Sequence, residues 1–96
     1  MTRYLVTWKA VNSRILEDRE ARIKASIGFI QIIQEALKSG PIKEYGTRPD
    51  NVMGYAIFEG NEADMARMAT MFVPHFEFEV HPIMTADEMM EVLKSA

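Results

Sequence analysis

Residues 74–82, Pro-His-Phe-Glu-Phe-Glu-Val-His-Pro, contain the clearest secondary-structure signal in the chain. Large apolar side chains alternate with histidine and glutamate, which predicts a β-strand with one apolar and one polar face. A proline at each end marks where this strand is expected to begin and to stop. Phe76, Phe78 and Val80 need a scaffold that buries them, and we expect the rest of the chain to supply it. The opposite side of the strand is therefore the first place to look for chemistry.

Three further strands are expected from their content of β-branched and aromatic residues, at residues 3–9, 42–47 and 52–59. The turn residues 48–51 join the second and third strands into a hairpin. With two long helices between the strands, the order is β-α-β-β-α-β, followed by a short C-terminal helix. This order predicts an α+β, ferredoxin-like sandwich in a single domain of residues 1–96, with both long helices on one face of the sheet.

Polar capping residues indicate where the helices begin. Asn12 or Ser13 is expected to cap a first helix that ends near Ser39, where glycine and proline follow. Asn61 with Asp64 opens the second helix, and Thr85 with Glu88 forms a capping box for the terminal one.

Two apolar stripes run along the first helix, a wider apolar arc than one sheet face requires. We expect the buried stripe to be Leu16, Ile23, Ile27, Ile30 and Leu37, with Phe29, Ile32, Ile33 and Ala36 beside it.

Composition narrows the range of functions. The chain has 96 residues, a formal net charge of −3 and no cysteine, so it has no disulfide framework, thiolate metal site or thiol nucleophile. Net acidity argues against nucleic-acid binding, although Gly54-Tyr55-Ala56 resembles part of an RNA-recognition signature. No stretch has the length of a membrane span or the pattern of a signal peptide, so we expect a cytoplasmic protein that binds neither membrane nor nucleic acid.

Both faces of the expected sheet carry apolar side chains, although both long helices are expected on one face. The face left open is predicted to contain Tyr4, Val6, Trp8, Tyr55 and Ile57. Such a patch is large for a soluble monomer. A second copy that pairs open face with open face would bury it in a closed barrel, with the terminal helix at the interface. The alternative is a monomer in which the terminal helix folds back over its own sheet.

Three segments, RYLVTWK (3–9), GYAIFEG (54–60) and FEFEVHPIM (76–84), resemble an uncharacterised family of small bacterial and archaeal proteins. That family lies in the dimeric α/β-barrel (ferredoxin-like) superfamily. The resemblance implies a homodimer and no assigned activity. More distant members of the superfamily include muconolactone isomerase-like enzymes, cofactor-free monooxygenases and effector-binding regulatory modules.

The polar face of residues 74–82 supplies the candidate catalytic residues Glu77, Glu79 and His81. His75 would extend this row at the start of the strand, although we expect its side chain to be exposed. Two neighbouring carboxylates in an apolar barrel repel each other, so one of them would hold its proton more tightly and suit acid or base chemistry. Histidine could shuttle a proton, and the same set could ligate a divalent metal. The alternative is a solvated strand face, or carboxylates paired with Arg3, Lys9 or Lys43. No metal or other cofactor is predicted.

Aromatic residues supply the candidate ligand-binding residues, Tyr4, Trp8 and Tyr55, with Glu59 at the barrel rim. We therefore expect a homodimer that binds a small apolar molecule in the barrel interior. The more distant superfamily members suggest an isomerase or monooxygenase-like activity for it. A non-catalytic sensor or interaction module with a packed barrel is the alternative, and the sequence leaves both open.

Overall fold

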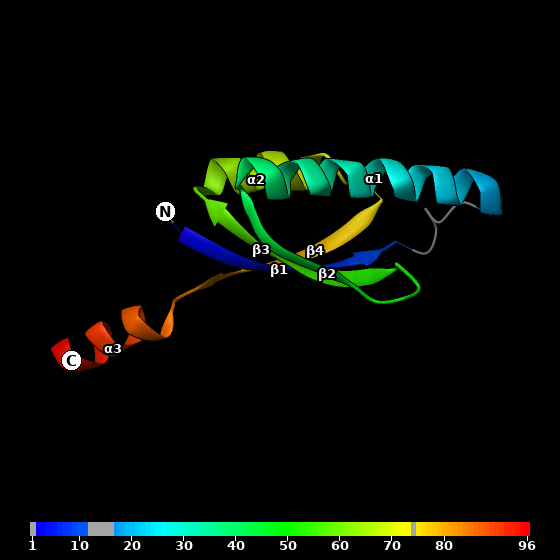
Figure 1. The fold of residues 1–96 in the computed structure, drawn as a ribbon. Helices are drawn as coiled ribbons and strands as arrows, with labels where there is room; N and C mark the ends of the chain where they lie inside the picture. The colour runs from blue at the N-terminus through cyan, green and yellow to red at the C-terminus, as the bar shows by residue number, and fades with distance from the viewer. Residues whose placement is uncertain (1, 12–16, 74) are drawn as a thin grey trace.

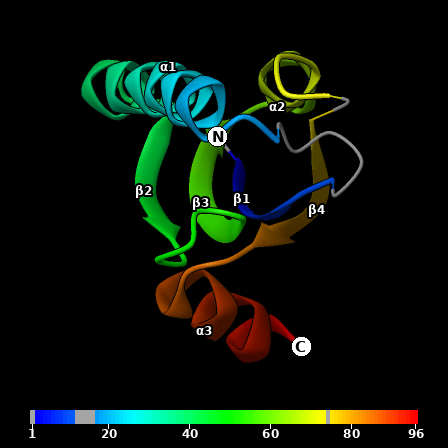
Figure 2. The ribbon, with the colours of Figure 1, turned by 90° about the vertical axis from the view of Figure 1, so that its right-hand side faces the viewer.

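A computed structural model describes residues 2–11, 17–73 and 75–96 (Figure 1). The four strands form one antiparallel sheet in the order β2-β3-β1-β4, and α1 and α2 cover the same face of it (Figure 2). The elements are β1 Thr2–Ala10, α1 Arg19–Ser39, β2 Ile42–Thr47, β3 Met53–Gly60, α2 Glu62–Thr70, β4 Phe76–Ile83 and α3 Ala86–Ser95. The predicted α+β class and element order are confirmed, and the arrangement is consistent with a ferredoxin-like fold.

The first helix begins later than the sequence suggested. Asp18 is its N-cap, and the Asp18 side chain accepts a hydrogen bond from the backbone N–H of Ala21 at 3.3 Å. The expected caps, Asn12 and Ser13, lie outside the described residues. At the other end Gly40 adopts a φ of 105°, and its N–H bonds to the carbonyl oxygen of Ala36 at 3.0 Å. This left-handed glycine cap is the predicted one.

Both predicted capping boxes are present in the structure. In α2, the Asn61 side chain accepts from the Asp64 backbone at 2.8 Å, and the Asp64 side chain accepts in return at 3.3 Å. In α3, Thr85 and Glu88 make the same pair of bonds at 3.1 and 2.9 Å. Each box satisfies two backbone donors that a helix start leaves unpaired, which explains why these two starts could be predicted locally.

The prediction of which face of β1 lies open is wrong. Tyr4, Val6 and Trp8 are buried beneath the helices, because β1 pairs with β3 so that they lie opposite Phe58, Ala56 and Gly54. The open face instead carries Leu5 and Thr7 of β1 beside Ile57 and Tyr55 of β3. Alternation defines two sets of side chains on each strand, but only the pairing register decides which sets share a face. The uncovered apolar surface is therefore smaller than expected.

The prediction of the buried stripe of α1 is also wrong. Ile33 and Ala36 are buried against the sheet and Phe29 packs on the same core, whereas Ile23 and Ile27 are 42% and 54% exposed. Leu37, expected in the buried stripe, is exposed as well, and Leu16 lies outside the described residues. The core thus uses Phe29, Ile33 and Ala36 of the stripe expected beside it, whereas Ile32 of that stripe is 37% exposed. The other apolar side chains of α1 are left for a different contact.

The edge strand β4 departs from the expected boundaries. It runs through Pro82 to Ile83, which an edge position permits because the missing N–H of proline faces no partner strand. Phe76 and Phe78 pack on the core beneath the helices as predicted. Val80, expected to be buried with them, is 38% exposed. Pro74 lies outside the described residues.

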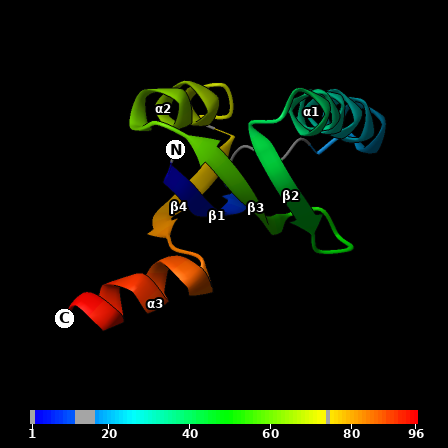
Figure 3. The ribbon, with the colours of Figure 1, turned by 60° about the vertical axis from the view of Figure 1, so that its left-hand side comes forward.

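The terminal helix α3 projects away from the sheet instead of packing on it (Figures 1 and 3). None of its residues is buried, and Met89, Met90, Val92 and Leu93 are 44% to 62% exposed. The described chain measures 56 × 25 × 24 Å. Its Cα radius of gyration is 15.5 Å, against about 12–13 Å for a compact domain of this length. The fold-back of α3 over its own sheet is therefore not the arrangement of this structure.

Candidate ligand-binding pocket

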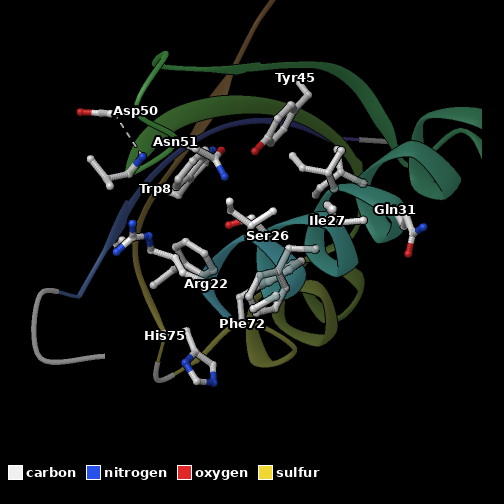
Figure 4. Close-up of a pocket in the computed structure, with 18 of the residues that line it drawn as sticks. Trp8, Arg22, Ser26, Ile27, Gln31, Tyr45, Asp50, Asn51, Phe72 and His75 are labelled. Atoms are coloured by element: carbon white, nitrogen blue, oxygen red, sulfur yellow. Dashed lines mark hydrogen bonds between the residues drawn. The ribbon is translucent and has the colours of Figure 1, made fainter. Parts of the chain in front are cut away.

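A pocket of about 730 Å³ lies between the N-terminal half of α1 and the helix-covered face of the sheet (Figure 4). We call it the helix-side pocket. Its walls come from α1, from the ends of β1 and β2, from the β2–β3 turn, and from the segment that leads into β4. The apolar side chains among its described lining are Trp8, Ala10, Ile23, Ala25, Ile27, Phe29, Ile30, Ile33, Tyr45, Val52, Phe72, Phe76 and Phe78.

The hollow follows from the side chains on the sheet-facing side of α1. Ile33 and Phe29 fill the space over the sheet, but Ser26 and then Arg22 follow at helical spacing toward the N-terminus. Ala25 is also short, so this half of the helix stands over the sheet without filling the space beneath it. Ile23 and Ile27, exposed to solvent, form part of the wall. Part of the α1 stripe that was expected to be buried, including Ile23 and Ile27, thus lines a pocket.

Aromatic rings form the opposite wall. The Trp8 indole stacks on Tyr45, with ring centroids 6.1 Å apart and planes 9° apart, and makes a T-shaped contact with Phe76, with ring centroids 5.5 Å apart. A Cβ atom on Gly54 would lie 2.7 Å from Cζ2 of Trp8, so the indole packs directly against the backbone of β3 where a side chain is absent. Rings held in this way present a flat, rigid apolar surface.

Polar groups gather where the pocket meets the β2–β3 turn. Thr47 Oγ1 donates to Asn51 Oδ1 at 2.8 Å, and Asn51 occupies the left-handed region with a φ of 58°. Arg48 binds Asp50 at 2.6 Å and holds the pKa of that carboxyl below its usual value. Burial raises the pKa of Tyr45, despite an opposing hydrogen bond with Thr47, so its hydroxyl keeps its proton at neutral pH. Trp8 Nε1 is buried and has no hydrogen-bond partner among the described residues.

A second hollow lies on the open face of the sheet, toward the same end. It has a volume of about 840 Å³ and brings together four of the predicted site residues, Trp8, Tyr55, Glu77 and Glu79, beside Lys9. The Tyr55 hydroxyl donates to Glu44 at 2.8 Å, and this bond raises the pKa of Tyr55. We call this the open-face hollow.

The remaining predicted site residues lie apart from these pockets. His81 is on the same face, 3.7 Å from Glu79, with both side chains largely exposed. Glu59 is also on this face, where its carboxylate accepts from Arg3 Nε at 3.0 Å. Tyr4 is a core residue on the other side of the sheet. The sequence therefore grouped two sets of residues that the sheet separates.

His75 does not extend the polar row of β4. It precedes the strand and is exposed, as predicted, and its ring lies 6.1 Å from that of Phe29 at the helix-side pocket. Across residues 2–11, 17–73 and 75–96, no group of three histidine, aspartate or glutamate side chains is arranged to hold a metal ion. Within the same ranges, no helix is long and apolar enough to cross a bilayer.

Several residues of the helix-side pocket were not predicted as site residues, including Tyr45, Asn51 and the isoleucines of α1. The sequence did contain one signal for the isoleucines, because the apolar arc of α1 exceeded what a single sheet face could bury. Tyr45 and Asn51 carry no comparable local signal. They reach the pocket because the hairpin β2–β3 brings its turn beneath the start of α1.

These features define a small α+β protein with a four-stranded antiparallel sheet and an apolar pocket under its first helix. A family profile described as "Domain of unknown function (DUF3303)" matches residues 2–96, and the chain belongs to this family. A comparison with curated proteins gave no match. Family membership supplies no activity, so any function has to be argued from the geometry.

Proposed function

We propose that the protein binds a small, largely apolar molecule in the helix-side pocket. The observation that carries this proposal is a space of about 730 Å³ between α1 and the sheet, lined mostly by aromatic and aliphatic side chains. Small-molecule sites have this size and character, with a few polar groups that orient the ligand. Solvent-exposed Ile23 and Ile27 at the wall would gain stabilisation from a ligand that removes them from water.

The test uses the apolar dye phenylnaphthylamine. Trp8, the single tryptophan of the chain, forms a wall of the pocket, so energy transfer from Trp8 reports dye bound nearby. We expect saturable transfer in the native protein and its loss in Ser26→Phe, which fills the space beneath α1. Lys24→Phe adds the same side chain to the same helix at an exposed position outside the pocket lining, and should leave binding intact. Equal dye binding by both variants, or none by the native protein, would refute the proposal and favour a packed interaction module.

We further propose that the working unit is a homodimer whose open faces meet as in an α/β barrel. Two observations support it. Leu5, Tyr55 and Ile57 lie on a face that no helix covers, and the apolar side of α3 contacts no core. Helices of about 12 residues or fewer are marginal alone in water, so α3 needs a surface to pack on. A second copy would cover both surfaces through one reciprocal interface.

Sedimentation velocity tests the dimer. We expect Ile57→Glu to shift the native protein toward the monomer, because it places a charge in the centre of the open face. Thr70→Glu, on an exposed position of α2 across the sheet, serves as the matched control and should not change the mass. A native protein that sediments as an 11.0-kDa species at micromolar concentration would contradict the proposal.

The open-face hollow is the second candidate site, because it joins Tyr55, Glu77 and Glu79 in a space that a partner subunit would enclose. A barrel-interior ligand, and an isomerase or monooxygenase-like activity with His81, belong to this candidate. Glu79→Gln should then change ligand binding or turnover without a large loss of stability, since its side chain is exposed in the single chain. Unchanged binding in Glu79→Gln, with loss in Ser26→Phe, would assign the ligand to the helix-side pocket instead.

A further inference from the structure

We propose that the solvent-exposed side of α1 is a docking surface for an acidic amphipathic helix of a partner protein. This inference goes beyond the proposed function, because it concerns a macromolecular partner and not the small ligand of the pocket. Two observations carry it. Apolar residues run along an uncovered side of α1 at the spacing of paired helices, and cations that form no ion pair among the described residues border them.

One side of α1 carries apolar residues in line. We call it the exposed stripe, and its members are Ile23, Ile27, Ile30 and Leu37, with Gln34 before the last of them. From Ile23 to Leu37 the positions, Gln34 included, are four, three, four and three residues apart. This spacing keeps side chains on one side of a helix and is the spacing through which two helices pack together. Ile23, Ile27 and Leu37 are 42%, 54% and 40% exposed, so this side of α1 is not buried.

The rest of the described chain leaves the exposed stripe largely uncovered. α1 lies above β2 at one edge of the sheet, and α2 stands apart from it (Figures 2 and 3). The core contact of α1 runs through Phe29, Ile33 and Ala36, which lie on a different side of the helix. Single exposed apolar residues are ordinary on a protein surface, whereas several in line at helix-packing spacing mark an interaction surface.

Cations border the exposed stripe. Arg19, Lys24 and Lys38 occupy the positions that flank an apolar seam in paired helices, and all three are exposed. None of the three forms an ion pair within residues 2–11, 17–73 and 75–96. Of the two acidic residues of α1, Glu20 lies in line with the stripe at its N-terminal end, and Glu35 lies away from it. The surroundings of the stripe are therefore net positive, although the whole chain has a formal charge of −3.

These charges select the partner. Side chains beside an apolar seam decide which helices pair, because they meet across the interface. Two copies of α1 would bring Arg19 near Lys24 in a parallel pair, or Lys24 near Lys38 in an antiparallel pair, and like charges oppose both. A helix with carboxylates beside its apolar seam meets cations instead. The exposed stripe is also narrow and contains Gln34, whereas a helix that lies on a membrane presents a broader apolar face.

Two designed peptides of the length of α1 test this inference with the native protein. Both have leucine at the a and d positions of each heptad, and the e and g positions carry glutamate in one peptide and lysine in the other. Fluorescence anisotropy of the labelled peptides measures their affinity. We expect the glutamate peptide to bind roughly tenfold more tightly, through a few exposed ion pairs of modest strength, and to weaken as salt is raised. The net charge of the whole chain would produce the opposite preference.

Matched variants locate the peptide on α1. Lys38→Glu and Lys94→Glu make the same charge change in the last turn of α1 and of α3. The first should reduce the preference for the glutamate peptide severalfold, and the second should leave it unchanged. Lys24→Glu combined with Lys38→Glu should reverse the preference, since both positions then repel glutamate. Leu37→Gln removes an apolar anchor outside the lining of the helix-side pocket, so it should weaken both peptides without changing dye binding.

Three results would overturn the inference. The first is equal affinity for the two peptides, or binding of neither, and phenylnaphthylamine binding would still decide the proposed function separately. The second is binding to phosphatidylglycerol vesicles that Ile27→Glu abolishes, which would assign the exposed stripe to a membrane surface. The third is a fall in the native mass upon Ile27→Glu, which would show that the stripe joins copies of this chain.

Discussion

Replacing Gly54 with alanine is expected to destabilise the protein and to disturb the wall of the pocket together. The new methyl group would lie 2.7 Å from Cζ2 of Trp8 and 2.9 Å from Cα of Thr47, and closer still to the carbonyl oxygen of Gly46. Ordinary contacts between carbon atoms are about 3.5–4.0 Å long, so each neighbour must move by roughly 1 Å. Two of the three are backbone groups of β2, a strand paired with β3, and they cannot turn aside as a flexible side chain does.

Overpacking of this kind costs about 1–3 kcal/mol, and the backbone contacts place Gly54→Ala at the upper end, about 3 kcal/mol. Alanine also lowers the entropy of the unfolded chain, which stabilises the folded protein by about 0.4–1 kcal/mol. The free energy of unfolding should therefore fall by roughly 2–3 kcal/mol in total. A domain of this size loses about 4–8 °C in Tm for each kcal/mol, so we expect Tm to fall by about 10–20 °C. Thermal unfolding followed by far-UV circular dichroism measures the loss, and the near-UV signal of Trp8 reports the displaced indole.

Gly28→Ala is the matched control, since a Cβ atom there meets no atom within 4 Å. Alanine is about 1 kcal/mol better than glycine inside a helix, so this variant should raise Tm by roughly 4–8 °C. Opposite shifts in Tm from the glycine-to-alanine substitutions at positions 28 and 54 would confirm that the close approach of Trp8 and β2 to Gly54 causes the loss of stability. A Gly54→Ala protein as stable as the native one would refute this account of how β3 positions the indole.

Three further predictions concern α3 and the core. Thr85→Ala removes a cap worth about 1 kcal/mol, and amide hydrogen exchange should accelerate in the first turn of α3 while β1 is unaffected. The backbone N–H of Thr85 lowers the pKa of Glu88 from 4.5, so the stabilisation is fully present above pH 4.5 and is lost as pH falls through the lower folded value. The helicity of α3 should decrease in that acidic range, whereas Glu88→Gln should abolish this pH dependence. Tyr4→Phe should leave dye binding unchanged, because Tyr4 is absent from the lining of the helix-side pocket, and weaker binding would place the ligand elsewhere.

Local chemistry was sufficient to predict most of the elements and their ends. Gly40, Asn61 with Asp64, and Thr85 with Glu88 act through bonds to backbone groups within a few residues, so these boundaries can be recognised in sequence. The start of α1 was misplaced because several polar residues between 12 and 18 are plausible caps. The structure assigns the role to Asp18.

The two faces of the sheet show where local reasoning fails. In β1 the residues Arg3, Leu5, Thr7 and Lys9 share one side, and two of them are cations, which in retrospect favours solvent for that side. The side chains on the other side of β1, Tyr4, Val6 and Trp8, are apolar. Apolar side chains are equally compatible with a helix-covered core and with a subunit interface. The choice depends on pairing with β3, whose glycine at position 54 receives Trp8 on the helix side.

The sequence by itself determined the element order, the caps, and the separation of Phe76 and Phe78 from Glu77 and Glu79, because each depends on periodicity or on bonds between near neighbours. Only the tertiary structure decided that Trp8 lies beneath α1 while Tyr55 lies on the open face, and that Ile23 and Ile27 border a hollow. The physical reason is that a pocket is space left between distant segments. The size of this pocket depends on the distance between α1 and the sheet. Residues such as Ser26 and Gly54 determine that distance only when folding brings them together.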